Sequence, residues 1–101
     1  MTLRFLEEAE AELVGAVRWY ARDDATLATD LARAVDERLA RAIAVPGAGR
    51  LETRAPPRFD LRWYAVRRFP YSLLVGTLSG ERVVVALAHE RRRPGYWLPR
   101  L

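Results

Sequence analysis

Hydrophobic residues recur in the first half of the chain at the three- and four-residue spacing of amphipathic helices. This spacing predicts one helix over residues 7–24 and a second over residues 25–45. The first stripe is Leu6, Ala9, Leu13, Val17 and Tyr20, and the second is Leu27, Leu31, Val35, Leu39 and Ile43. Asp24 can cap the second helix, and Pro46 ends it. Almost no residues connect the two predicted helices, which predicts that they form an antiparallel helical hairpin.

The pattern changes to the two-residue alternation of strands at the N-terminus and again after the helices. Residues 2–6 predict a short first strand, and residues 58–66 a longer one. The faces of the longer strand would carry Phe59, Leu61, Trp63 and Ala65 on one side and Arg58, Asp60, Arg62 and Tyr64 on the other. Residues 71–78 and 82–89 are more continuously apolar, which indicates central strands joined by a tight turn at residues 79–81.

The predicted element order is β-α-α-β-β-β, followed by a short C-terminal tail. It indicates an α+β fold in which the helical hairpin packs on a mainly antiparallel sheet. The length of 101 residues suits one domain, spanning residues 1–101, with a single core. A loop rich in glycine and proline at residues 47–57 separates the helical and strand-rich parts.

Composition narrows the classes of function. No apolar run approaches the roughly 20 residues needed to span a bilayer, and the N-terminus lacks the pattern of a signal peptide. We therefore expect a cytoplasmic protein without a membrane partner. Without cysteine, and with His89 as the single histidine, the sequence predicts no cofactor, no metal site and no histidine-based catalysis. His89 more often ends a strand through a hydrogen bond.

Charge is unevenly distributed along the chain. All 17 basic residues are arginines. Residues 1–50 hold 7 Arg against 9 acidic residues, a net of −2, whereas residues 51–101 hold 10 Arg against 4, a net of +6. Arginine presents a planar fork of donors that suits phosphates and carboxylates. The basic second half therefore predicts an acidic partner, either a nucleic acid or an acidic protein segment.

Strand pairing predicts where the arginines gather. Arg67 and Arg68 precede the strand at residues 71–78, and Arg91, Arg92 and Arg93 follow the strand at residues 82–89. The start of one antiparallel strand lies near the end of its partner, so we expect the five arginines at one edge of the sheet.

Aromatic residues have two interpretations, core packing or recognition. Tyr96 and Trp97 follow a Pro-Gly turn and fit a hydrophobic clasp over the core better than a stacking platform. Trp19, Tyr20 and Trp63 are interpreted as core or core-edge residues. Gly15 inside the first predicted helix is interpreted as a mark of close helix packing.

The element order, together with "RRFPYSLLV" at 67–75 and "AHERRRPGYW" at 88–97, resembles the RelE/ParE superfamily of bacterial type II toxins, in particular its ParE-like branch. The resemblance covers nearly the whole chain. It implies a toxin that arrests growth when free and that a cognate antitoxin holds inactive. RelE-like members cut mRNA in the ribosomal A site without a metal, whereas ParE-like members poison DNA gyrase by binding it.

The catalytic pattern of the RelE-like branch is largely missing. The positions that this pattern fills with two lysines, an arginine and a tyrosine hold Trp63, Ala65, Ser72 and Pro99. Arg93 matches the C-terminal arginine, and Tyr96 is the residue that could substitute for the tyrosine. The ParE-like interpretation needs none of these groups and is therefore preferred.

Three functions follow from the resemblance, in this order. The first is a ParE-like toxin that binds gyrase, with target-binding residues Arg67, Arg68, Arg91, Arg92, Arg93, Tyr96 and Trp97. The second is a ribosome-dependent mRNA endonuclease with Arg93 and Tyr96 as its catalytic pair. The third is a degenerate, non-toxic regulator that binds only its antitoxin. In each case we expect an extended, acidic, partly apolar antitoxin segment to wrap the helical hairpin and the sheet edge.

Overall fold

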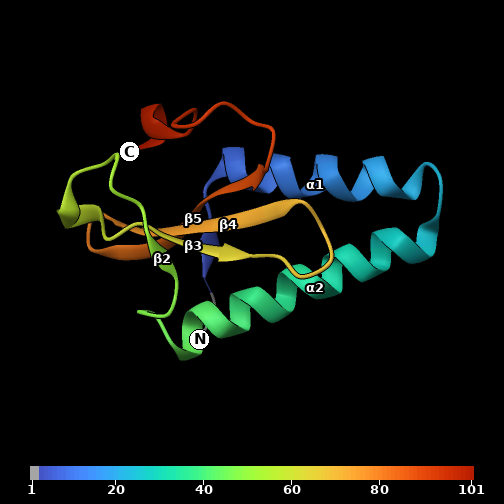
Figure 1. The fold of residues 1–101 in the computed structure, drawn as a ribbon, viewed down its shortest axis with the longest axis horizontal. Coiled ribbons are helices and arrows are strands. Elements are labelled where there is room, and N and C mark those ends of the chain that lie inside the picture. The colour runs from blue at the N-terminus through green and yellow to red at the C-terminus, as the bar shows by residue number, and fades with distance from the viewer. Residues whose placement is uncertain (1–2) are drawn as a thin grey trace.

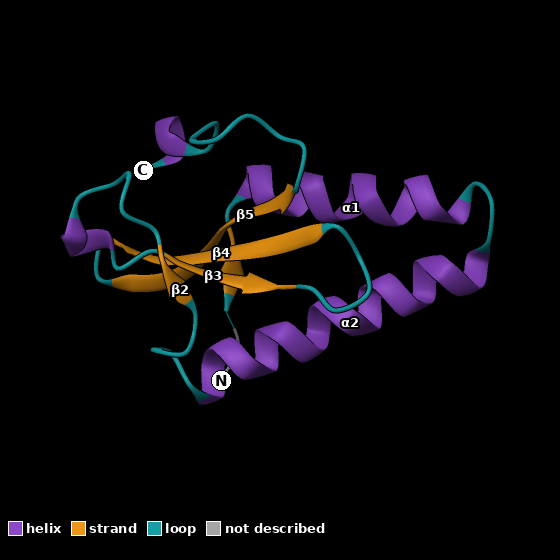
Figure 2. Ribbon diagram, in the orientation of Figure 1, coloured by secondary structure: helices purple, strands orange, loops and turns teal. Residues whose placement is uncertain are grey.

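A computed structural model describes residues 3–101. Helices α1 (Glu7–Ala21) and α2 (Ala25–Ala44) form an antiparallel hairpin that packs on a sheet (Figure 1). The sheet contains five strands in the order β1-β5-β4-β3-β2. The turn that joins the two helices projects beyond the ends of the strands (Figure 2). The α+β fold class that the sequence predicted is confirmed.

The helical hairpin forms where the hydrophobic stripes predicted it. The Asp24 carboxylate accepts a 2.8 Å hydrogen bond from the Thr26 N–H and thereby caps α2, as expected. Glu7, Glu8 and Glu10 occupy the first turn of α1, where the helix dipole favours negative charge. None of the helices in residues 3–101 is long and apolar enough to cross a membrane.

Strands β4 (Tyr71–Leu78) and β5 (Glu81–His89) form a long antiparallel hairpin at the centre of the sheet. Strand β1 (Arg4–Phe5) pairs with β5 in parallel. The predicted first strand is thus confirmed for its middle part; Thr2 lies outside the described residues. Gly80 adopts a φ of 78° in the tight turn between β4 and β5, a conformation that glycine reaches without strain.

Two sequence predictions about the strands are wrong. Strand β2 (Arg50–Leu51) lies in the stretch predicted as loop, where it pairs with β3 (Arg62–Ala65). Residues 58–60 are not extended, because they belong to a short 3₁₀ helix (Pro57–Phe59) and to a left-handed Asp60 with φ 43°, and β3 begins only at Arg62. The Asp60 carboxylate pairs with two arginine side chains, which holds this corner of the chain.

The two faces of the sheet pack against different parts of the chain. The helical face buries Leu31 and Val35 of α2 against Leu73 and Val84, together with the Tyr64 ring. The opposite face buries Leu61, Leu74 and Val85 against Trp97 from the C-terminal tail. Trp97 is 1% exposed, so the prediction that it packs over the core is confirmed.

Predictions about three individual residues need correction. Trp19 lies in the last turn of α1 and is 60% exposed rather than in the core. Tyr64, predicted on the polar face of its strand, is buried under the helices, where its hydroxyl donates to the Pro46 carbonyl at 2.6 Å. Gly15 does not mark close packing, because a Cβ added there would meet no atom of another element within 4 Å.

Candidate functional site

The C-terminal tail is fastened to α1 by one carboxylate. Glu12 accepts hydrogen bonds from the Tyr96 hydroxyl at 2.6 Å and from the Arg100 guanidinium at 2.8 Å. It also accepts the Leu87 N–H at 3.1 Å, while Arg100 donates to the Val85 carbonyl at 3.0 Å. Glu12 and Arg100 thereby satisfy backbone groups on the side of β5 that β1 leaves uncovered.

Tyr96 is a structural hydrogen-bond donor in this arrangement. Burial, followed by the hydrogen bond to Glu12 and the charge of that carboxylate, raises the pKa of the Tyr96 hydroxyl above its ordinary value. The Arg92 guanidinium lies 3.9 Å from the centre of the Tyr96 ring and stacks on it. A hydroxyl with a raised pKa, already bonded to a carboxylate, is a poor general base.

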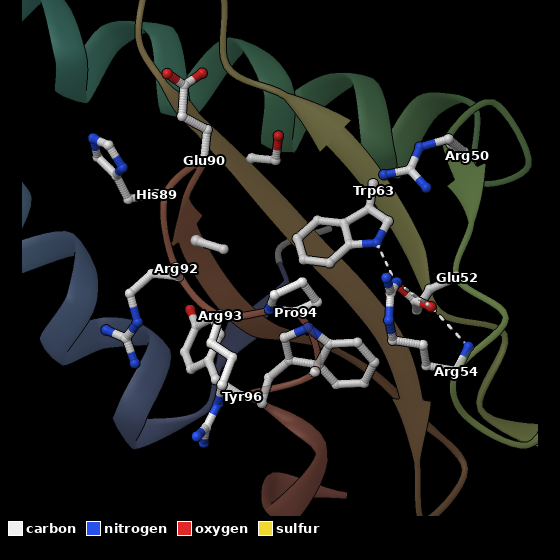
Figure 3. Close-up of a pocket in the computed structure, with 14 residues that line it drawn as sticks. Arg50, Glu52, Arg54, Trp63, His89, Glu90, Arg92, Arg93, Pro94 and Tyr96 are labelled. Carbon is white, nitrogen blue, oxygen red and sulfur yellow. Dashed lines mark hydrogen bonds and ion pairs between the residues drawn. The ribbon is translucent and has the colours of Figure 1, made fainter.

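A pocket of about 310 Å³ opens between the tail and strand β2 (Figure 3). Its wall on one side comes from β2 and the residues after it, and on the other from the segment after β5. The residues that line it include Arg50, Glu52, Arg54, Trp63, Ser72, Ala88, His89, Glu90, Arg92, Arg93, Pro94 and Tyr96. Of the predicted target-binding residues, it gathers Arg92, Arg93, Tyr96 and Trp97.

Glu52 is buried in the wall of this pocket. Its carboxylate accepts the Trp63 indole N–H at 3.0 Å, the Arg54 backbone N–H at 2.7 Å and the Arg54 guanidinium at 2.9 Å. Burial opposes ionisation of Glu52, but these hydrogen bonds and the Arg54 charge outweigh it, so the pKa of Glu52 lies below its usual value. The carboxylate therefore holds the indole and the guanidinium in fixed positions.

The five predicted arginines do not share one surface. The backbone of the two segments is adjacent as expected, since the Glu90 N–H donates to the Pro70 carbonyl at 2.9 Å. The Arg68 side chain, however, turns toward α2 and lies 3.8 Å from the Asp30 carboxylate. Arg67 lines the same hollow beside α2, whereas Arg92 and Arg93 line the pocket on the opposite face of the sheet.

His89 ends β5, and its Nδ1 accepts a 3.1 Å hydrogen bond from the Arg91 N–H. This confirms the prediction of a strand-ending role. Within residues 3–101, histidine, aspartate and glutamate form no cluster of three or more that could hold a metal ion.

Sequence reasoning missed four residues of this region: Glu12, Arg50, Glu52 and Arg54. Glu12 could have been found, because it lies three residues after Ala9 and four before Ala16, which are both buried. The other three lie in or beside β2, in a stretch whose glycines and prolines predicted a loop. Their role as a pocket wall appears only in the folded chain.

The helical hairpin on one face of the sheet and the arginine-rich tail on the other (Figure 1) make this a small, basic protein of the α+β class. The sequence profile described as "ParE toxin of type II toxin-antitoxin system, parDE" matches residues 3–94, and the chain belongs to this family. The fold is similar to that of a solved structure from a chromosomal ParDE TA system of P. aeruginosa, with a TM-score of 0.69 and 20% sequence identity. That match covers 88% of this chain and 95% of the other. No curated protein sequence matches the chain.

Proposed function

We propose that this toxin arrests growth by binding DNA gyrase, and that a cognate antitoxin neutralises it. The observation that carries the proposal concerns the side chains at the positions of a RelE-like catalytic set. Trp63 bonds to Glu52 and packs against Trp97 with ring centres 6.2 Å apart. Tyr96, the substitute tyrosine, bonds to Glu12. These aromatic side chains have structural partners, which favours a toxin that acts by binding.

A basic surface remains for the target. Arg91, Arg92 and Arg93 are exposed, and none of them forms an ion pair with another residue in the part of the chain that the structure describes. Unpaired guanidinium groups can bind carboxylates or phosphates in two-pronged geometry. The surface therefore suits an acidic region of a gyrase–DNA complex.

The exposed face of α1 supports an antitoxin that covers the helical hairpin. Val14 is 41% exposed and Trp19 is 60% exposed. A hollow of about 270 Å³ beside Trp19 is lined by Gly15, Trp19, Tyr71 and Arg92, among others. Large apolar side chains beside cations suit an amphipathic segment that carries both apolar and acidic residues.

A gyrase supercoiling assay with the purified toxin tests this proposal. We expect inhibition by the native chain and loss of inhibition in the folded double variant Arg91→Glu with Arg93→Glu, which leaves the Arg92–Tyr96 stack in place. The matched control is Arg33→Glu with Arg41→Glu, which reverses two exposed arginines of α2 and gives the same net charge. The proposal is wrong if both double variants inhibit alike, or if the native chain leaves gyrase active.

The order in which cellular syntheses stop provides a second test. After induction of the toxin alone, pulse labelling would show DNA synthesis failing first if gyrase is the target. Earlier failure of protein synthesis would instead indicate the ribosome and mRNA. Continued growth with soluble, folded protein would indicate the non-toxic regulator.

A further inference from the structure

The pocket beside β2 combines an aromatic ring with cations on a face of the sheet that the helices leave open. Its floor contains Ser72 and Ala88, which are paired across β4 and β5 and are small enough to leave room above them. In Figure 3 the Trp63 indole lies between Arg50 on one side and the Arg93–Pro94 segment on the other.

The ring and one cation are fixed before any ligand arrives. The Glu52 side chain is 2% exposed and bonds both the Trp63 indole and the Arg54 guanidinium, which removes much of their freedom. Fewer side-chain motions are then lost on binding, so the site is preorganised.

The pocket carries a net positive charge. Four arginines (Arg50, Arg54, Arg92 and Arg93) line it against two carboxylates (Glu52 and Glu90). Glu52 pairs with Arg54, while Arg50 and Arg93 form no ion pair within residues 3–101. The Arg50 guanidinium extends toward the Trp63 indole, whereas Arg92 points away from the pocket centre (Figure 3). An anionic group can therefore lie between Arg50 and Arg54, next to the ring.

We propose that this pocket binds one nucleotide of a single-stranded nucleic acid without cleaving it. The base stacks on the Trp63 indole, and the adjacent phosphate lies between the Arg50 and Arg54 guanidinium groups. A nucleotide supplies a flat ring and an anion within one unit, whereas an acidic peptide needs two residues placed correctly. Bases inside a duplex are stacked on each other and cannot offer a free face. This site goes beyond the proposed binding of gyrase and does not depend on it.

Two groups near the pocket that could transfer a proton already form hydrogen bonds within the chain. The Tyr96 hydroxyl donates to Glu12, and His89 Nδ1 accepts the Arg91 N–H. Neither atom is available to accept a proton from a 2′-hydroxyl.

Fluorescence anisotropy of a labelled oligothymidylate of about ten nucleotides measures binding to the purified full chain. We expect the single strand to bind at least tenfold more tightly than a duplex of equal length. In a Trp19→Phe background, the remaining tryptophan fluorescence falls as the oligonucleotide is added, because the base stacks on Trp63. Equal affinity for the duplex, or unchanged fluorescence, would overturn the proposal.

Paired variants separate the pocket from general charge attraction. Arg50→Gln is expected to weaken binding by roughly tenfold, the value of one charge-assisted hydrogen bond. Arg33→Gln removes the same charge from exposed α2 and is expected to change the affinity less than twofold. Equal losses in the two variants would mean that net charge alone binds the strand, and the site would be wrong.

Two further measurements test the ligand class. An unlabelled peptide of alternating glutamate and phenylalanine is expected to compete poorly with the oligonucleotide. Stronger competition by the peptide would assign the pocket to an acidic protein instead. A single-stranded RNA incubated with the toxin is expected to stay intact, and its cleavage at the bound position would contradict binding without chemistry.

Discussion

The Tyr96 hydroxyl donates a 2.6 Å hydrogen bond to a carboxylate oxygen of Glu12, which lies 84 residues earlier in the chain. The same carboxylate accepts from Arg100 and from the backbone of β5. One side chain of α1 therefore joins the first helix, the last strand and the C-terminal tail. The position of the tail, and with it one wall of the pocket, depends on this junction.

Replacement of Glu12 by glutamine tests the junction. The Arg100 side chain is 13% exposed and would lose its only ion-pair partner in the described part of the chain. We expect the free energy of unfolding to fall by about 2–3 kcal/mol, measured by urea denaturation. Glu81→Gln, which breaks the exposed pair with Arg4, is the control and is expected to change the stability little.

Tyr96→Phe removes the hydroxyl and keeps the ring beneath Arg92. We expect a loss of about 1–2 kcal/mol in the free energy of unfolding, because one hydrogen bond to a carboxylate disappears. Growth arrest on induction is expected to persist, since the proposed target surface is unchanged. A folded Tyr96→Phe variant that no longer arrests growth would instead support a catalytic tyrosine.

We expect an added methyl group to have opposite effects on stability at two glycines, Gly76 and Gly15. In Gly76→Ala the new Cβ would overlap the Leu61 side chain and lie 3.2 Å from the Phe59 carbonyl oxygen. We expect a loss of about 1–3 kcal/mol in unfolding free energy. Gly15→Ala, which meets open space in α1, is expected to gain up to about 1 kcal/mol. Thermal or urea unfolding of both variants distinguishes them.

The stability contributed by Glu52 depends on pH. Its pKa in the folded chain is below the ordinary value of 4.5, so the ionised carboxylate stabilises the fold above that value. This contribution falls as the pH drops through the lowered pKa of the folded state. We therefore expect Glu52→Gln to be less stable than the native chain near neutral pH, and the difference to narrow in strong acid. The measurement is the midpoint of urea denaturation of the native chain and of Glu52→Gln, near neutral pH and in strong acid.

Local patterns in the sequence were sufficient for the helical hairpin and for β4 and β5. The stripes on the helices have one buried face each, and the two central strands are apolar throughout, so neighbouring residues alone indicate their structure. Strand β2 was missed because only two of its residues pair. Residues 58–61 alternate as a strand would, but the ion pairs of Asp60 with Arg62 and Arg82 favour a left-handed turn.

The candidate site was predicted less completely than the fold. Arg92, Arg93 and the packing of Trp97 follow from positions near the end of β5. The separation of Arg68 from these residues depends on its ion pair with Asp30 of α2. The pocket depends on Arg50, Glu52 and Arg54, which lie in or beside β2 at the edge of the sheet. Such relationships are set by the direction of side chains across the sheet, and the spacing of residues along the chain does not contain them.

Strand β5 lies between β1 and β4, and α1 packs against it. In the described residues β5 follows the other four strands of the sheet along the chain. During translation, β1 and the side of α1 that packs on β5 have no partner in the sheet until β5 has left the ribosome. We therefore expect a prematurely terminated chain to remain unfolded and harmless. The order of the strands ties folding of the sheet to the synthesis of β5.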